Sequence, residues 1–205
     1  MGLVQVRAGT RSDLAGAVDV LGRAFQVEPV YEWLWPDPAQ RRRRLPVLLR
    51  ANLIHLHRGP ASFDVATMEG RIVGVSIWDG PTHRNAGRLR RALAWPGRAR
   101  ATSGRLDRLT RVSAALAAVR PVEPHWYLDH VGADPDVPRC GAGSALLAAG
   151  LARAEGARVG THLECKAANV DYYRRFGFEV RDEVVVVSGR LTVLTMWRGD
   201  PGSPA

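Results

Sequence analysis

The sequence predicts a mixed α/β fold in which helices flank a central mixed β-sheet. Three observations support this prediction. Strand-like segments recur along the whole chain, helical periodicity fills the intervals between them, and a Gly-rich loop separates a strand from a helix at residues 140–143. The sequence shows no internal repeat and no linker, so we expect residues 1–199 to form a single domain. The Gly- and Pro-rich residues 200–205 should form a disordered tail.

The first half of the chain is expected to provide strands, helices and a hairpin. Ser12 and Asp13 offer an N-cap to apolar residues at helical spacing, and Pro29 should interrupt the helix that follows. Glu69 and Gly70 favour a tight turn between two strand-like segments. The expected elements are a strand at 4–7, a helix at 14–25, an irregular aromatic segment at 31–36, a helix at 39–57 and paired strands at 62–68 and 71–78.

The second half begins with an Arg- and Ala-rich segment, residues 82–120, which we expect to form a helical insert. Pro96-Gly97 should break it once, and Ser103-Gly104 offers a second break. The sequence then predicts a strand at 125–133, the Gly-rich loop, a helix from 144 to about 155, a strand at 159–165, a short helix at 170–175 and strands at 180–187 and 191–197. A ligand is expected where the strand before the loop meets the helix after it.

Composition limits the classes of protein to which the chain can belong. Of its 205 residues 46% are hydrophobic, which suffices for a buried core, but no apolar run approaches the ~20 residues of a membrane span. The N-terminal segment lacks the basic and apolar pattern of a secretory signal. Cys140 and Cys165 are too few for a disulfide framework and indicate free thiols. We therefore expect a cytoplasmic protein without a membrane partner.

The net charge of +9 and the pI of about 10.8 would suit a polyanionic partner such as nucleic acid. However, Lys166 is the only lysine, and the arginines are spread along the whole chain. Together with the abundance of Ala and Gly, this bias is typical of a GC-rich coding sequence. We therefore expect no nucleic-acid partner, although a positive surface would help to recruit an anionic ligand.

Residues 131–144 carry the strongest local motif, VGADP followed by RCGAGS and an apolar helix. Glycines between a strand and a helix let backbone N–H groups converge, and the partial positive charge of the helix N-terminus favours a phosphate. Arg139 could add a charge-assisted hydrogen bond. The alternative is that the glycines serve only close packing. The spacing of a dinucleotide fingerprint and the Gly-Lys-Ser/Thr of a nucleoside-triphosphate loop are both missing.

A second motif lies downstream, in residues 163–169 (LECKAAN) and 172–178 (YYRRFGF). Together with the Gly-rich loop, it resembles the acetyl-CoA half of GNAT acetyltransferases. Within that superfamily the chain most resembles the puromycin N-acetyltransferase-like group, to which residues 124–128 (PHWYL) are also similar. The resemblance is strong from about residue 121 to residue 177. It implies the GNAT-type acyl-CoA N-acyltransferase fold and an enzyme that transfers acetyl from acetyl-CoA to an amine without a metal.

The resemblance also implies which residues bind acetyl-CoA. Backbone groups at the end of the strand before the loop would hold the pantetheine and the thioester, and the loop would hold the pyrophosphate. The implied residues are Val131, Gly132, Ala133, Arg139, Cys140, Gly141, Ala142, Gly143, Ser144 and Asn169. Asn169 could also serve as a helix N-cap. Pro138 departs from the family pattern, which has Gln or Arg there, and Cys140 replaces a commoner basic residue, so a hydrogen bond to the cofactor could be missing.

Direct attack of an amine on a thioester needs a proton acceptor for the amine and a proton donor for the leaving thiolate. Tyr173 resembles the family tyrosine that protonates the thiolate, and a core tyrosine is the alternative. Glu164 is the first candidate for the base, because burying a carboxylate in an apolar strand is costly and therefore suggests a function. The alternative is a structural carboxylate bonded to nearby backbone. Asp129 and His130 are the other candidates. Strand alternation predicts Asp129 on the face of Tyr127 and His130 on the opposite face.

Substrate recognition is expected to involve the helical insert and a group of aromatic residues beside an acidic one, because such a group can hold a cationic amine. These residues are Glu28, Tyr31, Trp33 and Trp78, and core packing is the alternative for each. The expected partner is a small-molecule amine, an antibiotic among the candidates, bound by a monomer or homodimer. A peptide or protein N-acetyltransferase and a non-catalytic acyl-CoA-binding domain remain open. His55 and His57 cannot share one helix face, so no metal site is expected.

Overall fold

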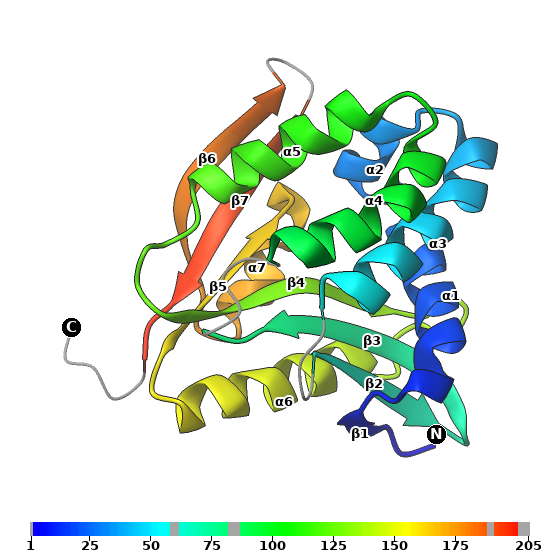
Figure 1. Ribbon diagram of the computed structural model, residues 1–205. Helices are drawn as coiled ribbons and strands as arrows, with labels where there is room; N and C mark the ends of the chain where they lie inside the picture. Colours follow the sequence, from blue (N-terminus) through cyan, green and yellow to red (C-terminus); the bar gives the residue numbers. More distant parts are fainter. Residues whose placement is uncertain (1, 58–61, 82–86, 188–190, 201–205) are drawn as a thin grey trace.

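Seven strands form one mixed sheet in the computed structural model, which describes residues 2–57, 62–81, 87–187 and 191–200 (Figure 1). Their order is β1-β2-β3-β4-β5-β7-β6, and β4 and β5 are the only parallel neighbours among the described residues. The strands are β1 (Gln5–Ala8), β2 (Phe63–Met68), β3 (Arg71–Asp79), β4 (His125–Ala133), β5 (Gly160–Cys165), β6 (Glu179–Val187) and β7 (Leu191–Arg198). The predicted mixed α/β fold is confirmed, whereas residues 201–205 of the predicted tail lie outside the described residues.

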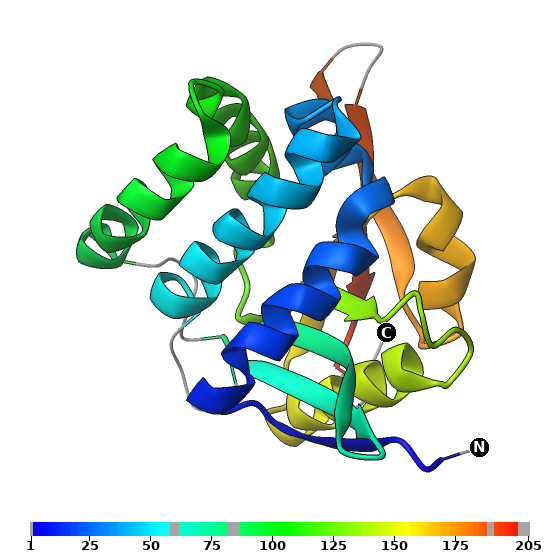
Figure 2. The same ribbon diagram turned by 90° about the vertical axis from the view of Figure 1, so that its right-hand side faces the viewer.

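Helices cover both faces of the sheet, as Figures 1 and 2 show. One face carries α6 (Ala142–Gly156) and α7 (Val170–Arg174), whose apolar side chains pack with those of β4, β5 and β7. The other face carries α1 (Leu14–Ala24), α2 (Pro29–Leu34), α3 (Pro38–His55), α4 (Arg88–Thr102) and α5 (Leu106–Ala118). No helix in the described part of the chain combines the length and hydrophobicity that a bilayer span requires.

Two predictions about prolines were wrong. Residues 31–34 of the aromatic segment are helical, because Pro29 occupies the first turn of α2, where its missing N–H costs nothing; only residues 35 and 36 are irregular as predicted. Pro96-Gly97 does not break α4, which runs through to Thr102. At this point Gly97 packs so closely on α3 that an added Cβ would lie 2.7 Å from the Cβ of Ala51, so tertiary packing holds the helix together. The break comes at Ser103-Gly104, whose φ angles are 43° and 85°.

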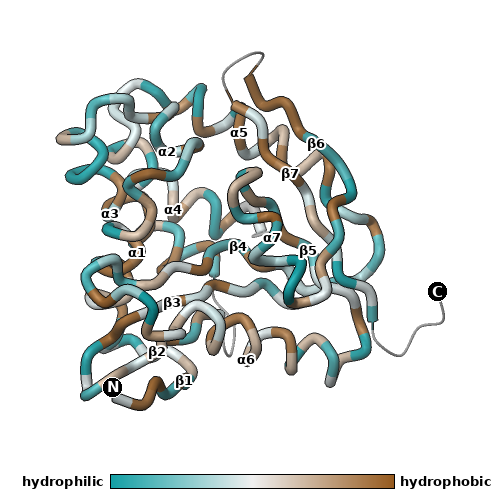
Figure 3. Tube along the Cα trace, turned by 180° about the vertical axis from the view of Figure 1, so that it is seen from behind, coloured by the Kyte–Doolittle hydropathy of each residue, from teal (hydrophilic) through white to brown (hydrophobic). Residues whose placement is uncertain are grey.

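The two helices of the insert, α4 and α5, connect opposite sides of the molecule. α4 packs on α3, while Val112 of α5 packs on Val184 and Val193 of the β6–β7 hairpin. The part of β6 that meets α5 is the strongly hydrophobic stretch seen in Figure 3. Held at both ends, the insert passes above the centre of the sheet and covers β4 from a distance (Figure 1).

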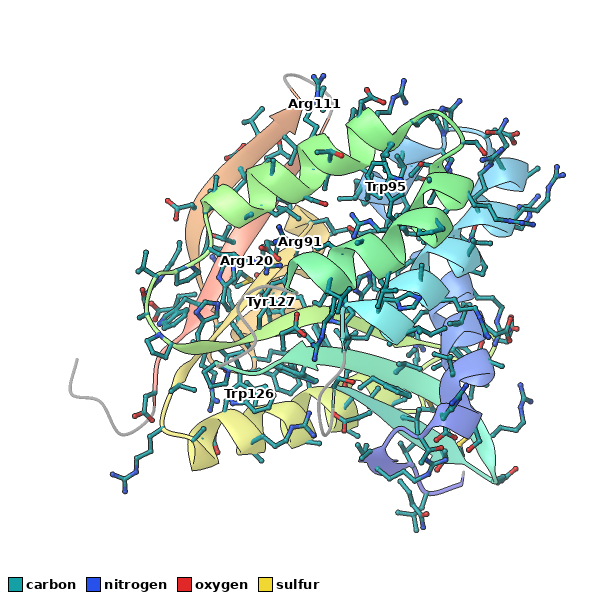
Figure 4. All side chains as sticks on the ribbon, in the orientation of Figure 1. Arg91, Trp95, Arg111, Arg120, Trp126 and Tyr127 are labelled. Atoms are coloured by element: carbon teal, nitrogen blue, oxygen red, sulfur yellow. The ribbon has the colours of Figure 1, made fainter. Side chains whose placement is uncertain are left out.

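A bulge in β4 changes the direction of one predicted site residue. Ile77 of β3 pairs with His130 and Trp78 pairs with Leu128, so Asp129 is the extra residue. Because the bulge shifts the alternation by one residue, His130 lies on the same face as Tyr127 and Asp129, contrary to the prediction. Figure 4 shows Tyr127 on the side of the insert and Trp126 on the side of α6.

The parallel strands β4 and β5 pair over only part of their length. His125–Leu128 pairs with Gly160–Leu163, and beyond these residues the described parts of the two strands are no longer bonded to each other. A gap in the sheet therefore opens beside residues 129–133 of β4.

The helix α6 is seated on the sheet by a close contact between Gly150 and Trp78. A Cβ added at Gly150 would lie 2.1 Å from the indole ring, so only glycine permits this approach. The indole is almost fully buried, and its Nε1 donates to Ser76 Oγ at 3.1 Å. Farther along the helix, Arg153 forms a bidentate pair with the buried Asp64 of β2, at 2.6 and 3.0 Å. These contacts fix the position of α6 and therefore of the loop before it.

Candidate active site

A cavity of about 630 Å³ lies between the sheet and the insert. Its floor comes from β4 and β5, its far end from α7, and its sides and roof from α2, α3, α4 and α5. Of the residues predicted from the sequence, those that line this cavity are Glu28, Tyr31, Asp129, His130, Val131, Glu164, Asn169 and Tyr173. Residues separated by more than 140 positions are thus brought to one site.

The predicted phosphate loop follows β4 and leads into α6. Arg23 of α1 donates to both carboxylate oxygens of the buried Asp134, at 2.7 and 3.3 Å, and so anchors the start of the loop. Arg139 and Gly141 adopt φ angles of 60° and 82°, and α6 begins at Ala142 instead of Ser144. The first N–H groups of α6 have no acceptor within the helix, which leaves them available to an anion.

Asn169 and Tyr173 lie at the far end of the cavity. Asn169 precedes α7, but its side chain does not cap that helix, and within the described residues no hydrogen bond occupies its amide. Tyr173 packs against Phe178 and is 7% exposed. Its hydroxyl has no hydrogen-bond partner in the described part of the chain. Burial, reinforced by nearby Cys165, Tyr172 and Glu28, raises the pKa of Tyr173, so the phenol keeps its proton at neutral pH.

Asp129 is the centre of a buried network. Asp129 Oδ2 accepts from His130 Nδ1 at 2.5 Å and lies 3.2 Å from His57 Nε2, whose Nδ1 lies 3.0 Å from Asp79. Burial opposes the ionisation of Asp129, but the two imidazoles that face it, His130 and His57, hold its pKa well below the usual range. At the other end of the network, the Tyr31 hydroxyl lies 2.7 Å from His130 Nε2.

The hydrogen positions in this network follow from the charges. Burial, with the charges of Asp129 and Glu28, raises the pKa of Tyr31, so its hydroxyl is protonated. His130 Nδ1 donates to the Asp129 carboxylate, which can only accept, and in the neutral imidazole Nε2 then accepts from the Tyr31 hydroxyl. An Asp–His–Tyr chain thus ends at a hydroxyl oxygen that lines the cavity.

Glu164 lies on β5 and is held by two side chains. Its Oε2 accepts from the Tyr127 hydroxyl at 2.7 Å, and its Oε1 lies 3.3 Å from His162 Nε2. Burial, with the charge of Glu164, raises the pKa of Tyr127 well above its ordinary value, so Tyr127 remains a donor. Both carboxylate oxygens of Glu164 are therefore engaged within the described structure.

The four predicted substrate residues do not lie together. Glu28 and Tyr31 line the cavity, and the Glu28 carboxylate forms an ion pair with Lys166 at 3.2 Å. Trp33 lies outside the cavity lining, with Arg108 stacked over its ring at 5.2 Å. Trp78 lies on the opposite face of the sheet, beneath α6. For these two residues the structure shows packing, which was the alternative.

Several residues that line the cavity were missed by the sequence reasoning. His57 and Asp79 complete the network around Asp129, and Arg98 and Arg120 project from the insert. His57 was considered only as a metal ligand, because its spacing from His55 was the only local signal. Its true partners lie 22 and 72 residues away in the sequence, and no local pattern reveals such contacts.

We expect the His57→Gln variant to be less stable than the wild-type protein near pH 6, by about 2–4 kcal/mol, because it leaves the half-buried Asp129 without its ion pair to His57. Burial alone would lower the pKa of His57, but Asp129 and Asp79 outweigh it and raise the pKa to about 10. Because the pKa of His57 is higher in the folded than in the unfolded protein, its protonation stabilises the fold. This stabilisation is complete below the unfolded pKa of about 6.5 and is lost as pH rises through about 10.

The difference between the two proteins should therefore shrink steadily between about pH 6.5 and pH 10. Urea unfolding at three pH values measures this difference in the free energy of unfolding, with His55→Gln, at the last residue of α3, as the control. A difference that stays constant with pH would show that His57 is not charged in the folded protein.

Comparison with known proteins agrees with this geometry. Residues 27–178 match the model of the Acetyltransferase (GNAT) family. The chain is similar to a solved structure from Corynebacterium glutamicum described as histone acetyltransferase HPA2 and related acetyltransferase, with 25% identity, 100% coverage of both chains and a TM-score of 0.71.

Two further solved structures show the same fold at lower identity. The polyamine N-acetyltransferase of Drosophila melanogaster, which forms N-acetylagmatine, is 14% identical over 96% of this chain and 100% of that chain, with a TM-score of 0.63. The ribosomal-protein-S18-alanine N-acetyltransferase of Escherichia coli is 15% identical over 98% of this chain and 97% of that chain, with a TM-score of 0.56.

Proposed function

The chain belongs to the acetyltransferase (GNAT) family, and on that premise we propose that it transfers acetyl from acetyl-CoA to the primary amine of a small molecule bound beneath the insert. The observation that carries this proposal is the position of the unbonded Tyr173 hydroxyl. Tyr173 lines the same cavity as the Asp129–His130–Tyr31 chain, so a candidate proton donor and a candidate proton acceptor face one space.

The insert supports a small acceptor over a protein. α4 and α5 supply the roof of the cavity, and the insert is held at both ends, so an extended peptide would have to displace it. The resemblance of the sequence to the puromycin N-acetyltransferase-like group supports the inclusion of amino-bearing antibiotics among the candidate acceptors. The named relatives acetylate amines of different kinds, from polyamines to a ribosomal protein.

For the proton acceptor we propose the chain Tyr31–His130–Asp129. A substrate ammonium gives a proton to the Tyr31 oxygen while the Tyr31 proton passes to His130 Nε2. The imidazolium that forms is stabilised by the Asp129 carboxylate, which His57 keeps ionised. The neutral amine then attacks the thioester carbon, and the C–S bond breaks as the tetrahedral intermediate collapses. The excess proton on the new amide nitrogen replaces the one that the thiolate takes up, and the imidazolium releases the first proton to solvent.

For the proton donor we propose Tyr173, which would give its proton to the sulfur of the leaving thiolate. Cys165 also lines the cavity, but burial and then the charges of Glu28 and Glu164 raise its pKa to about 12. A neutral thiol is a weak nucleophile, which supports direct transfer between the substrates without an acyl-enzyme.

The test is release of thiol from acetyl-CoA with a panel of amines, amino-bearing antibiotics included. We expect Tyr173→Phe to lower kcat by about 10²-fold or more, because the thiolate then leaves without a proton. Tyr172→Phe is the matched control: its hydroxyl lies 3.4 Å from Ser144 Oγ, so the expected change is confined to the KM for acetyl-CoA. A failure of every amine to release thiol, with acetyl-CoA still raising the melting temperature, would favour a binding domain instead.

A further inference from the structure

The charges around the cavity are divided between its two sides. Carboxylates come from the sheet and the start of α2, namely Asp79, Asp129, Glu164 and Glu28. Guanidinium groups come from the insert, Arg91 and Arg98 on α4 and Arg120 just after α5. Figure 4 shows Arg91 and Arg120 on the side of the insert, above Tyr127 of β4. The cavity therefore has an acidic floor and a basic roof.

The carboxylates of the floor are already compensated from within the same half of the cavity. Glu28 pairs with Lys166, and His57 lies between Asp79 and Asp129. Glu164 takes its hydrogen bonds from Tyr127 and His162. The arginines of the roof add a longer-range attraction to Asp129 and Glu164, but they form no ion pair with any floor carboxylate among the described residues.

Arg98 carries a charge without a matching carboxylate. In the described part of the chain it forms no ion pair, and its one hydrogen bond is a long contact of 3.5 Å to the neutral amide of Asn52. Half-buried beside the cavity, it loses hydration, and this burial lowers the pKa of the guanidinium despite the nearby charge of Asp129. An anion in the cavity would supply the missing partner.

Arg120 is a second guanidinium of the roof; burial opposes its charge, but Tyr127, Glu164 and Asp129 outweigh burial and raise its pKa. Its guanidinium stacks over the Tyr127 ring at 3.8 Å, and its Nε is buried without an acceptor. Like Arg98, it forms no ion pair within the described residues. Both arginines interact electrostatically with Asp129, so both lie near the point where the proton chain meets the cavity.

We propose that the acceptor is a compact amino acid or a close analogue, whose carboxylate binds Arg98 and Arg120 while its amine lies at Tyr31. The inference rests on the proposed function and specifies its substrate class. A planar guanidinium binds a carboxylate in a bidentate manner, and the proximity of both arginines to Asp129 requires a short separation between amine and acid. A polyamine would place a second cation against the basic roof, at a cost in binding.

The experiment compares α-amino acids with their own carboxamides, which keep the amine and lose the negative charge. We expect kcat/KM to favour the acid by about 10–100-fold in the wild-type enzyme, since charge-assisted hydrogen bonds contribute this much. Arg98→Met should reduce the preference by about 10-fold, because it raises the KM of the acid more than that of the carboxamide, which carries no charge for Arg98 to bind. Arg100→Met, an exposed arginine on the same helix, is the matched control.

Equal use of acid and carboxamide by the wild-type enzyme would overturn the inference, as would a preference that survives both Arg98→Met and Arg120→Met. Binding distinguishes a failure of the inference from a failure of the proposed function. N-acetylated amino acids should raise the melting temperature of the wild-type protein more than their carboxamides do, and Arg98→Met should remove the difference. If this holds without thiol release from any amine, only the proposed transfer fails. Absence of the difference overturns the carboxylate site.

Discussion

The His130→Gln enzyme is expected to show a kcat about 10²–10⁴-fold below that of the wild type near pH 7. The amide side chain introduced by this substitution keeps a hydrogen bond to Tyr31 and to Asp129 but cannot accept the proton that Tyr31 passes on. The acceptor would then have to bind as the rare neutral amine. Because the free amine becomes more abundant as pH rises, the defect should shrink toward about pH 10. Steady-state rates at saturating acetyl-CoA across this pH range measure both effects.

Glu164→Gln provides the contrast, since the sequence made Glu164 the first candidate for the base. Its carboxylate is occupied by Tyr127 and His162, so we expect a loss of no more than about 10-fold and no dependence on pH beyond that of the wild type. A large, pH-dependent loss in Glu164→Gln together with a mild one in His130→Gln would return the role of base to Glu164.

Gly150→Ala is expected to destabilise the protein by about 3 kcal/mol or more, although alanine is the better helix former by about 1 kcal/mol. The new Cβ would lie 2.1 Å from the Trp78 indole, whose Nε1 is tied to Ser76, so the ring cannot simply turn away. The helix α6 must shift instead, and it carries the phosphate loop at its start. Chemical denaturation measures the stability, and the KM for acetyl-CoA reports the shift.

Gly156→Ala is the matched control, because nothing lies within 4 Å of a Cβ at that exposed end of the same helix. It should be neutral or slightly stabilising. The double variant Gly150→Ala/Trp78→Leu should lose less stability than the sum of the losses in the two single variants, since a smaller side chain at position 78 makes room for the Cβ. Strictly additive losses would mean that the two residues are not in contact.

The parts of the site that lie close together in the chain could be predicted from the sequence. The Gly-rich loop, Asn169 and Tyr173 stand in segments whose local spacing fixes their relation to a helix start, and the structure places the loop before α6 and the other two beside α7. Trp78 was misjudged for a different reason. An aromatic residue in a strand indicates burial, but the face on which it is buried depends on a register that one residue reverses.

The parts that depend on distant contacts could not be predicted. The bulge at Asp129 arises from pairing with β3, more than 50 residues earlier, and it alone brings His130 to the cavity. The arginines of the insert lie in a segment where nearly every turn carries an arginine, so composition does not distinguish Arg98 from its exposed neighbours. Arg98 lines the cavity only because the insert folds over the sheet.

The gap between β4 and β5 affects how the acceptor specificity of this enzyme can evolve. A donor arm that entered it would bond to peptide N–H and C=O groups left over where the two strands part, as an added strand does at a sheet edge. Peptide groups are common to all residue types, so side chains along residues 131–133, beyond the proton chain, could be exchanged while the donor is still held. New acceptors could then be acquired on this edge without loss of the shared donor.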